Sequence, residues 1–191
     1  MLSPHDQPVL LTSRLMLRPF TLADLSDLVV LAGDREVAAM TLSIPHPYTA
    51  EHGREWISQQ PQRRAEGKAV NFAIALPNHT LCGSIGLGLN SAQNLAELGY
   101  WVGQPYRGQG YATEAARAVI DFGFGTLGLN RINATHFSDN PASGRVMEKL
   151  GLVYEGGRRR HTLKWGEYRD IKLYGLLRED WSGIVRTPPV D

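Results

Sequence analysis

The sequence has a single cysteine, almost no net charge and no long apolar run, and each absence excludes a class of protein. The lone Cys82 rules out an internal disulfide framework and multi-cysteine metal sites, and we expect no bound metal. A formal net charge of +1 provides no global field that would recruit nucleic acid or an anionic membrane. No apolar run approaches the roughly eighteen residues that span a bilayer, and the N-terminus has no basic region followed by an apolar stretch. We therefore expect a cytoplasmic protein that binds neither membranes nor nucleic acid.

The sequence does contain enough apolar material for one core. The chain has 191 residues, of which 42% are hydrophobic, and this size suits a single domain. We assign residues 1–183 to that domain and expect 184–191, with the segment Thr187-Pro188-Pro189, to form a disordered tail. The sequence leaves open whether the domain is a monomer or a homodimer.

Hydrophobic periodicity predicts the order of strands and helices. The segment from Leu10 to Arg18 alternates, with Leu15 and Leu17 on one side, and predicts a first strand. Further strands are expected at 70–76, 82–89, 96–102, 131–137, 152–159 and 171–177, and helices at 22–32, 49–66, 112–124 and 141–150. This order is typical of an antiparallel meander, a helical crossover to a parallel strand and a terminal hairpin. It predicts a mixed α+β sheet of about seven strands flanked by about four helices.

One short stretch carries the main functional signal. After the strand 96–102, Gly108 and Gly110 remove side chains where the backbone must turn, so that consecutive N–H groups can converge on an anion. The first turn of the next helix, from Ala112 to Ala115, adds unpaired N–H groups and the positive end of a helix dipole. A P-loop is excluded because Gly110 is followed by Tyr111 instead of lysine. The stretch predicts a phosphate cradle, with a plain glycine-rich turn as the alternative.

The arrangement of Arg107, Gly110 and Ala112 resembles the Arg/Gln-x-x-Gly-x-Gly/Ala pyrophosphate motif of the GNAT superfamily of acetyl-CoA-dependent N-acetyltransferases. The segment 97–102 before it resembles the fourth strand of that family, and the region 139–152 after it resembles the second cofactor helix. The opening residues, Leu11 to Phe20, resemble the RimJ/RimL-like branch, which acetylates the N-termini of ribosomal proteins. The resemblance implies two central strands that splay apart, with acetyl-CoA inserted between them.

The resemblance also implies which residues hold acetyl-CoA. The cradle N–H groups would bind its pyrophosphate, Asn140 would contact its arm, and a backbone N–H at the end of the strand 97–102 would hold the oxyanion. The cofactor-binding residues expected on this basis are Trp101, Val102, Arg107, Gly108, Gln109, Gly110, Tyr111, Ala112, Thr113, Asn140 and Ser143.

Acetyl transfer to an amine requires a proton acceptor. We expect Glu97 to be this base, because it lies on the strand beside the splay, where many GNAT enzymes carry a working glutamate. The alternative is a solvent-facing charge, since the register of the strand decides which face Glu97 occupies. His136, Glu167 and Asp170 are the fallback bases.

The departing thiolate requires a proton donor. Many relatives use a tyrosine at the position that is Met147 here, and a methionine cannot donate a proton. Ser143 has a hydroxyl one helical turn earlier, and the ribosomal-protein branch is similar in having serine there. We expect Ser143 to be the acid, and the alternative is a hydroxyl that only hydrogen-bonds the start of its helix.

The acceptor is the part that the sequence determines least. The proline-stiffened loop from Ser43 to Tyr48 is either a connector or a wall of the acceptor site. The basic run from Gly156 to His161 is either a solvated hairpin or a contact for an acidic acceptor or a cofactor phosphate. The resemblance implies a primary amine as acceptor, first a protein N-terminus and second a small amine such as an antibiotic or amino acid. A non-catalytic acyl-CoA-binding or regulatory domain is the alternative of a different class.

Overall fold

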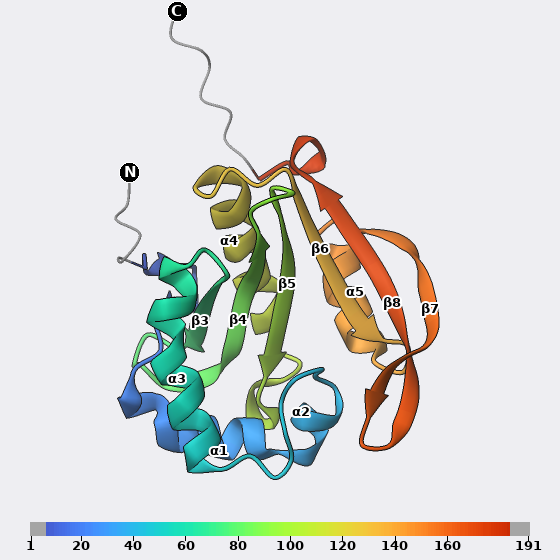
Figure 1. The fold of residues 1–191 in the computed structure, drawn as a ribbon. Coiled ribbons are helices and arrows are strands. Elements are labelled where there is room, and N and C mark those ends of the chain that lie inside the picture. The colour runs from blue at the N-terminus through green and yellow to red at the C-terminus, as the bar shows by residue number, and fades with distance from the viewer. Residues whose placement is uncertain (1–6, 184–191) are drawn as a thin grey trace, which may run out of the picture.

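The computed structural model describes residues 7–183, so the expected tail at 184–191 lies outside the described residues. The strands are β1 (Leu10–Leu11), β2 (Met16–Arg18), β3 (Ala69–Ala75), β4 (Leu81–Asn90), β5 (Leu95–Val102), β6 (Arg131–Phe137), β7 (Val153–Lys164) and β8 (Glu167–Leu177). They form one sheet in the order β1-β2-β3-β4-β5-β6-β8-β7 (Figure 1). Neighbouring strands are antiparallel except β5 and β6, which run parallel, as the helical crossover predicts.

The prediction of one continuous first strand is wrong. The segment 10–18 forms two short strands, β1 and β2, which pair with each other. The chain turns between them, where the N–H of Thr12 donates to the carbonyl oxygen of Leu15. The Thr12 hydroxyl and the N–H of Arg14 both donate to the carboxylate of Glu114, at 2.6 and 2.9 Å. These bonds to a distant helix replace those of a continuous strand, and the described sheet has eight strands instead of about seven.

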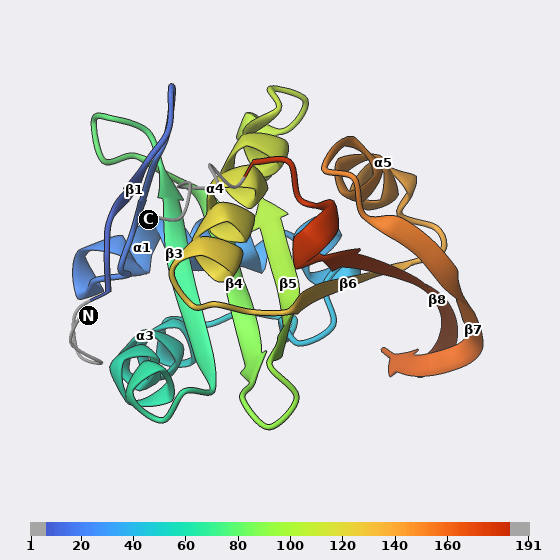
Figure 2. The ribbon, with the colours of Figure 1, turned by 90° about the horizontal axis from the view of Figure 1, so that it is seen from above.

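The helices are α1 (Leu25–Gly33), α2 (Arg35–Ala39), α3 (Ala50–Ala65), α4 (Tyr111–Gly125) and α5 (Pro141–Lys149). Figures 1 and 2 show α4 and α5 on one face of the sheet, and α1 and α3 on the other, over β3 and β4. The sequence did not predict α2, because five residues are too few to display a helical period. Within residues 7–183, none of the helices is long and apolar enough to cross a membrane.

Each face of the sheet has its own apolar core. The core under α4 and α5 includes the predicted stripe of Ala115, Val119 and Phe122. The core under α1 and α3 contains Phe20, whose ring packs edge-on against Trp56 with centroids 4.8 Å apart. Because side chains alternate along a strand, successive residues of one strand point toward opposite sides of the molecule.

The parallel strands β5 and β6 pair along only part of their length. Their register runs from Leu95 opposite Arg131 to Leu98 opposite Ala134. Both strands continue for several residues beyond this point, and Figure 1 shows them diverging. β4 still pairs with β5 as far as Val102, so only the β6-facing edge of β5 loses its partner. The splay that the family resemblance implies is therefore present.

Candidate active site

The turn before α4 has the geometry of an anion-binding cradle. Gly108 and Gly110 have φ of +76° and +82°, where L-residues are strained. A Cβ at Gly108 would meet nothing within 4 Å, so the backbone conformation, and not packing, favours glycine there. Gly110 immediately precedes α4, whose first N–H groups have no carbonyl partner within the helix. Residues 107–110 are exposed, so a phosphate can reach these groups.

Arg14, which was not among the predicted site residues, holds the cradle in place. Its guanidinium donates to the carbonyl oxygen of Gln109 at 2.9 Å and to the carboxylate of Glu114 at 2.7 Å. The same group lies 4.9 Å from the centroid of the Tyr111 ring. Burial alone would raise the pKa of Glu114, but hydrogen bonds from Thr12 and Arg14 lower it below its ordinary value. The one acidic side chain in the first turn of α4 is therefore neutralised by Arg14.

The last residues of β5 and the start of the cradle are tied to each other and to α2. The guanidinium of Arg107 donates to the carboxylate of Glu36 at 2.8 Å and to the carbonyl oxygen of Val102 at 3.2 Å. The Trp101 side chain packs into the core under α1 and α3. The Trp101 side chain therefore supports the fold, whereas the Arg107 side chain both ties the turn to α2 and lines the hollow described next.

A hollow of about 560 Å³ lies between the cradle and α5, and we call it the cradle-side hollow. It brings together Arg107 and Asn140, two predicted cofactor residues from distant parts of the sequence. The unpredicted helix α2 supplies much of the remaining wall. The lining residues are Arg35, Glu36, Ala39, Met40, Arg107, Asp139 and Asn140.

The start of α5 places Ser143 against β5. Asn140 caps this helix, its Oδ1 accepting the N–H of Ser143 at 3.3 Å. The Ser143 hydroxyl lies 2.9 Å from the hydroxyl of Tyr100, which also donates to the Ser143 carbonyl oxygen at 3.0 Å. Burial raises the pKa of Tyr100 to about 12, and the hydrogen bond with Ser143 opposes the rise. Tyr100 therefore keeps its proton at neutral pH.

Tyr100 is a site residue that the sequence predictions missed. It lies on the part of β5 that has separated from β6. Tyr100 shares the α4 and α5 face of β5 with the buried Ala96 and Leu98, and its partner Ser143 lies forty-three residues away in the sequence, so no local pattern connects the two. Met147, on the same helix, is 1% exposed and packs in the core.

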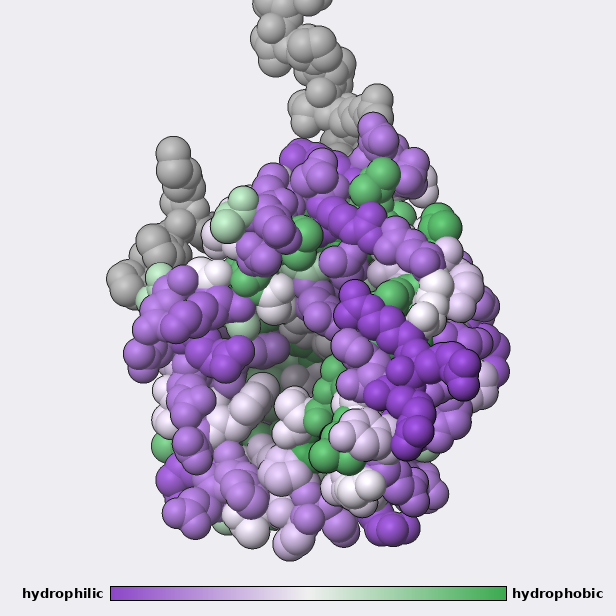
Figure 3. Space-filling view, turned by 45° about the vertical axis from the view of Figure 1, so that its right-hand side comes forward, coloured by the Kyte–Doolittle hydropathy of each residue, from purple (hydrophilic) through white to green (hydrophobic). Residues whose placement is uncertain are grey.

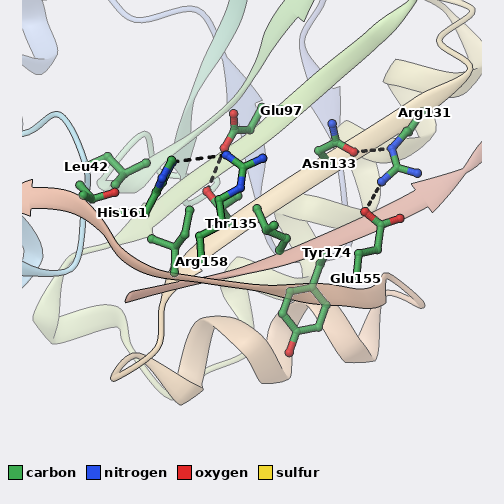
Figure 4. A pocket seen from close by; sticks show the side chains of 12 residues that line it. Leu42, Glu97, Arg131, Asn133, Thr135, Glu155, Arg158, His161 and Tyr174 are labelled. Atoms are coloured by element: carbon green, nitrogen blue, oxygen red, sulfur yellow. Dashed lines mark hydrogen bonds and ion pairs between the residues drawn. The ribbon is translucent and has the colours of Figure 1, made fainter. Parts of the chain in front are cut away.

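Glu97 lies on the other face of β5 and lines a hollow of about 400 Å³, visible as a depression in Figure 3. Figure 4 shows its carboxylate beside Thr135, whose hydroxyl donates to Glu97 Oε1 at 2.9 Å. Glu97 has no ion pair within residues 7–183. We call this space the open-face hollow. Its lining residues are Leu42, Glu97, Arg131, Asn133, Thr135, Glu155, Arg158, His161, Thr162, Ile171, Leu173 and Tyr174.

The fallback bases lie elsewhere. His136 lies on the face of the sheet that α5 covers, opposite the face of Glu97. It is close to Gly144 of α5, and burial lowers its pKa. Asp170 accepts a backbone N–H from β7 at 2.7 Å, and Glu167 begins β8 at the hairpin turn. Of the four candidate bases, Glu97 is the one that lines the open-face hollow.

The loop 43–48 contacts the turn between β7 and β8. Lys164 Nζ donates to the carbonyl oxygen of Ile44 at 2.9 Å, and the rings of His46 and Trp165 lie 5.7 Å apart. Leu42, just before the loop, lines the open-face hollow, whereas the loop residues themselves do not. A role of the loop as an acceptor wall stays a prediction.

A family model described as an acetyltransferase (GNAT) domain matches residues 14–153. The chain belongs to the GNAT acetyltransferase family. The p20 protein of Bacillus licheniformis, named an uncharacterized N-acetyltransferase, is 31% identical over 176 residues, which are 91% of this chain and 98% of that protein. The [ribosomal protein uS5]-alanine N-acetyltransferase of Escherichia coli is 35% identical over 85 residues, 44% of either chain. Mycobacterium smegmatis RimJ, solved in complex with CoA-disulfide, is 24% identical and has the same fold, with a TM-score of 0.79 over 87% of this chain and 83% of that one.

This GNAT protein is therefore an acetyl-CoA-dependent N-acetyltransferase, and its relatives include ribosomal-protein N-acetyltransferases of the RimJ/RimL-like kind. The cradle fits the cosubstrate, because its exposed N–H groups, positive-φ glycines and helix N-terminus suit a pyrophosphate. Acetyl-CoA supplies the activated acetyl group. The protein has to place it, hold the developing oxyanion and move two protons.

Proposed function

We propose that this GNAT acetyltransferase acetylates a primary amine bound in the open-face hollow, with Glu97 as base and Ser143 as acid. One observation carries the proposal: Glu97 and Tyr100, which contacts Ser143, lie on opposite faces of β5, one just before and one just after the point where β6 leaves it. An amine that enters from the open face and an acetyl donor that enters from the cradle side would meet at this splay.

Glu97 would make the amine nucleophilic. A primary amine is mostly protonated near neutral pH, because its pKa is about 8 for an α-amino group and about 10 for an amine on an alkyl chain. The hydrogen bond from Thr135 orients the Glu97 carboxylate, which can accept the ammonium proton directly or through one water. The β6-facing edge of β5 after Leu98 carries backbone groups that have lost their strand partner, and an N–H there would hold the oxyanion.

Ser143 would protonate the departing thiolate. Its hydroxyl lies within hydrogen-bond distance of the Tyr100 hydroxyl, which is protonated at neutral pH. Tyr100 is thus placed to orient the serine and to replace the proton that the serine gives up. Met147, buried in the core, leaves no other hydroxyl at the family position.

We propose a protein N-terminus as the first acceptor to test. The support is the similarity to the Escherichia coli enzyme, whose name specifies an alanine of ribosomal protein uS5. A small amine is the second candidate, because a hollow of about 400 Å³ can enclose a small molecule.

The decisive experiment is an amine panel with acetyl-CoA and the full chain. Peptides that begin with Ser or Ala, amino acids and aminoglycosides are each incubated with the protein, thiol release is followed, and the product is identified by mass. The proposal expects at least one amine to accelerate thiol release and to gain an acetyl group on nitrogen. Tight acetyl-CoA binding without amine-dependent thiol release would instead indicate a non-catalytic acyl-CoA-binding domain.

A further inference from the structure

The basic run lies on an irregular part of β7. The pairing with β8 is interrupted after Arg158 and resumes at Thr162, while β8 advances by only two residues. Within this bulge Arg160 has φ +47°, and its N–H donates to Asp170 Oδ1 at 2.7 Å. Bulges re-aim side chains and are frequent beside active sites. Here both Arg158 and His161 line the open-face hollow.

Arg158 has a defined direction within the hollow. Its Nη1 lies 3.4 Å from Nε2 of His161, which can accept a hydrogen bond from the guanidinium. Figure 4 shows Arg158, His161 and Glu97 around the same part of the hollow. The next residue in sequence, Arg159, is exposed but does not line this space. The bulge therefore assigns one arginine of the run to the hollow and leaves its neighbour outside.

Two opposite charges in the hollow lack ion-pair partners among the described residues 7–183. Arg131 is paired with Glu155. In the part of the chain that the structure describes, neither Arg158 nor Glu97 makes an ion pair. A ligand that carries an ammonium and a carboxylate would complement both groups, and a guanidinium matches the planar, two-oxygen geometry of a carboxylate.

We propose that the acceptor carries a carboxylate close to its amine, and that Arg158, oriented by His161, binds this carboxylate while the amine lies at Glu97. The inference rests on the proposed function, because Glu97 marks the amine end. The carboxylate can come from a free amino acid or from an acidic side chain near a peptide N-terminus. Within the basic run, Arg158 is therefore assigned to the acceptor and not to a cofactor phosphate, because it lines the hollow of Glu97 and not the cradle-side hollow.

The test compares matched acid and amide probes. Calorimetry on the full chain saturated with CoA measures the affinity of serine against serinamide, and of the peptide amide Ser-Asp-Ala against Ser-Asn-Ala. We expect the acid member of one pair to bind about tenfold more tightly, as a charge-assisted hydrogen bond provides. The pair that discriminates identifies the source of the carboxylate.

Two variants locate the effect. Arg158→Gln should abolish the preference for the acid member, whereas Arg159→Gln, with the same change in net charge, should retain it. Both side chains are exposed, so both variants should fold, which circular dichroism checks. Equal binding of both members of each pair, no binding of any probe, or an equal loss in both variants would overturn the inference. A third outcome is a preference for the acid probes that depends on Arg158, combined with no amine-dependent thiol release from acetyl-CoA. That outcome would support the carboxylate site and overturn the proposed enzymatic function.

Discussion

The two sides of the β5–β6 splay are built from different parts of the chain. The cradle side presents backbone N–H groups of Gly108 to Thr113, held in place by Arg14. The open-face hollow presents side chains from four strands and from Leu42. A site of backbone groups needs only the right backbone conformation, which many side chains permit, whereas the ligand of a side-chain site changes with the side chains that line it. The family resemblance therefore predicts the acetyl donor, whereas the identity of the acceptor depends on the side chains of this particular protein.

Removing the base should have the largest effect on turnover. Glu97→Gln keeps the shape of the side chain, so acetyl-CoA should bind normally while turnover near neutral pH falls by roughly 100- to 1000-fold. Part of the rate should return in alkaline buffer, where more of the amine is neutral. A pH–rate profile measures this, with Glu155→Gln as a control in the same hollow. If the Glu97 variant and the wild type have superimposable profiles, Glu97 is a surface charge.

A change in the cradle should weaken only the binding of the acetyl donor. Gly110→Val places a branched side chain at φ +82° and in the path of the anion, and we expect CoA affinity to fall by roughly 100-fold. Gly125→Ala, at the far end of the same helix with open space around it, should leave the affinity unchanged. Calorimetry with CoA measures both variants. Unchanged affinity in a folded Gly110 variant would remove the cradle from the binding site.

Removing the proposed acid, Ser143, should have the next largest effect on turnover. Ser143→Ala should lower turnover by roughly 10- to 100-fold, because water partly substitutes for the hydroxyl, and should lower CoA affinity less. Tyr100→Phe, which keeps the ring and removes the hydroxyl beside Ser143, should have a smaller effect of the same kind. Steady-state rates and CoA affinities separate the two contributions. Full activity of the Ser143 variant would exclude it from proton transfer.

Much of the fold was predictable because its signals are local. The strands and helices from 69 to 177 follow from alternation, proline and glycine, and the cradle follows from a contiguous motif. The first strand was not predictable, because the turn that divides it depends on Glu114, about a hundred residues later in the chain. The short helix α2 carried too little periodicity to be recognised.

The acceptor side was predictable only in part. The position of Glu97 beside the splay was predicted from its strand, but its face depends on the register of β5. The contact of Tyr100 with Ser143 and the direction of Arg158 depend on a crossover and on a bulge. Such features arise from tertiary structure, and no local pattern reports them.

A change far from both hollows should affect stability and not turnover. Arg18 makes a bidentate ion pair with Asp24, which is 5% exposed. Burial alone would raise the pKa of Asp24, but hydrogen bonds from Arg18 and Thr21 lower it below its ordinary value. This contribution to stability is present above the unfolded pKa of about 4 and is lost as the pH falls through the lower folded value.

Arg18→Ala should therefore cost about 3 kcal/mol of unfolding free energy at neutral pH, with that loss becoming smaller in acid. Urea denaturation at several pH values measures it. Lys68→Ala, which removes one partner of an exposed pair with Glu66, serves as the control and should change stability little. If the loss for Arg18→Ala does not depend on pH, the pair does not contribute in this way. Turnover per folded molecule should stay unchanged.

Amide hydrogen exchange with and without CoA tests most directly whether donor and acceptor occupy opposite sides of the splay. CoA should slow exchange at the N–H groups of residues 108–113, which are otherwise near the exposed start of α4. Exchange in the bulge of β7, residues 158–162, should stay unchanged. Protection of the bulge with no change at 108–113 would contradict the account, because it would place the donor in the open-face hollow.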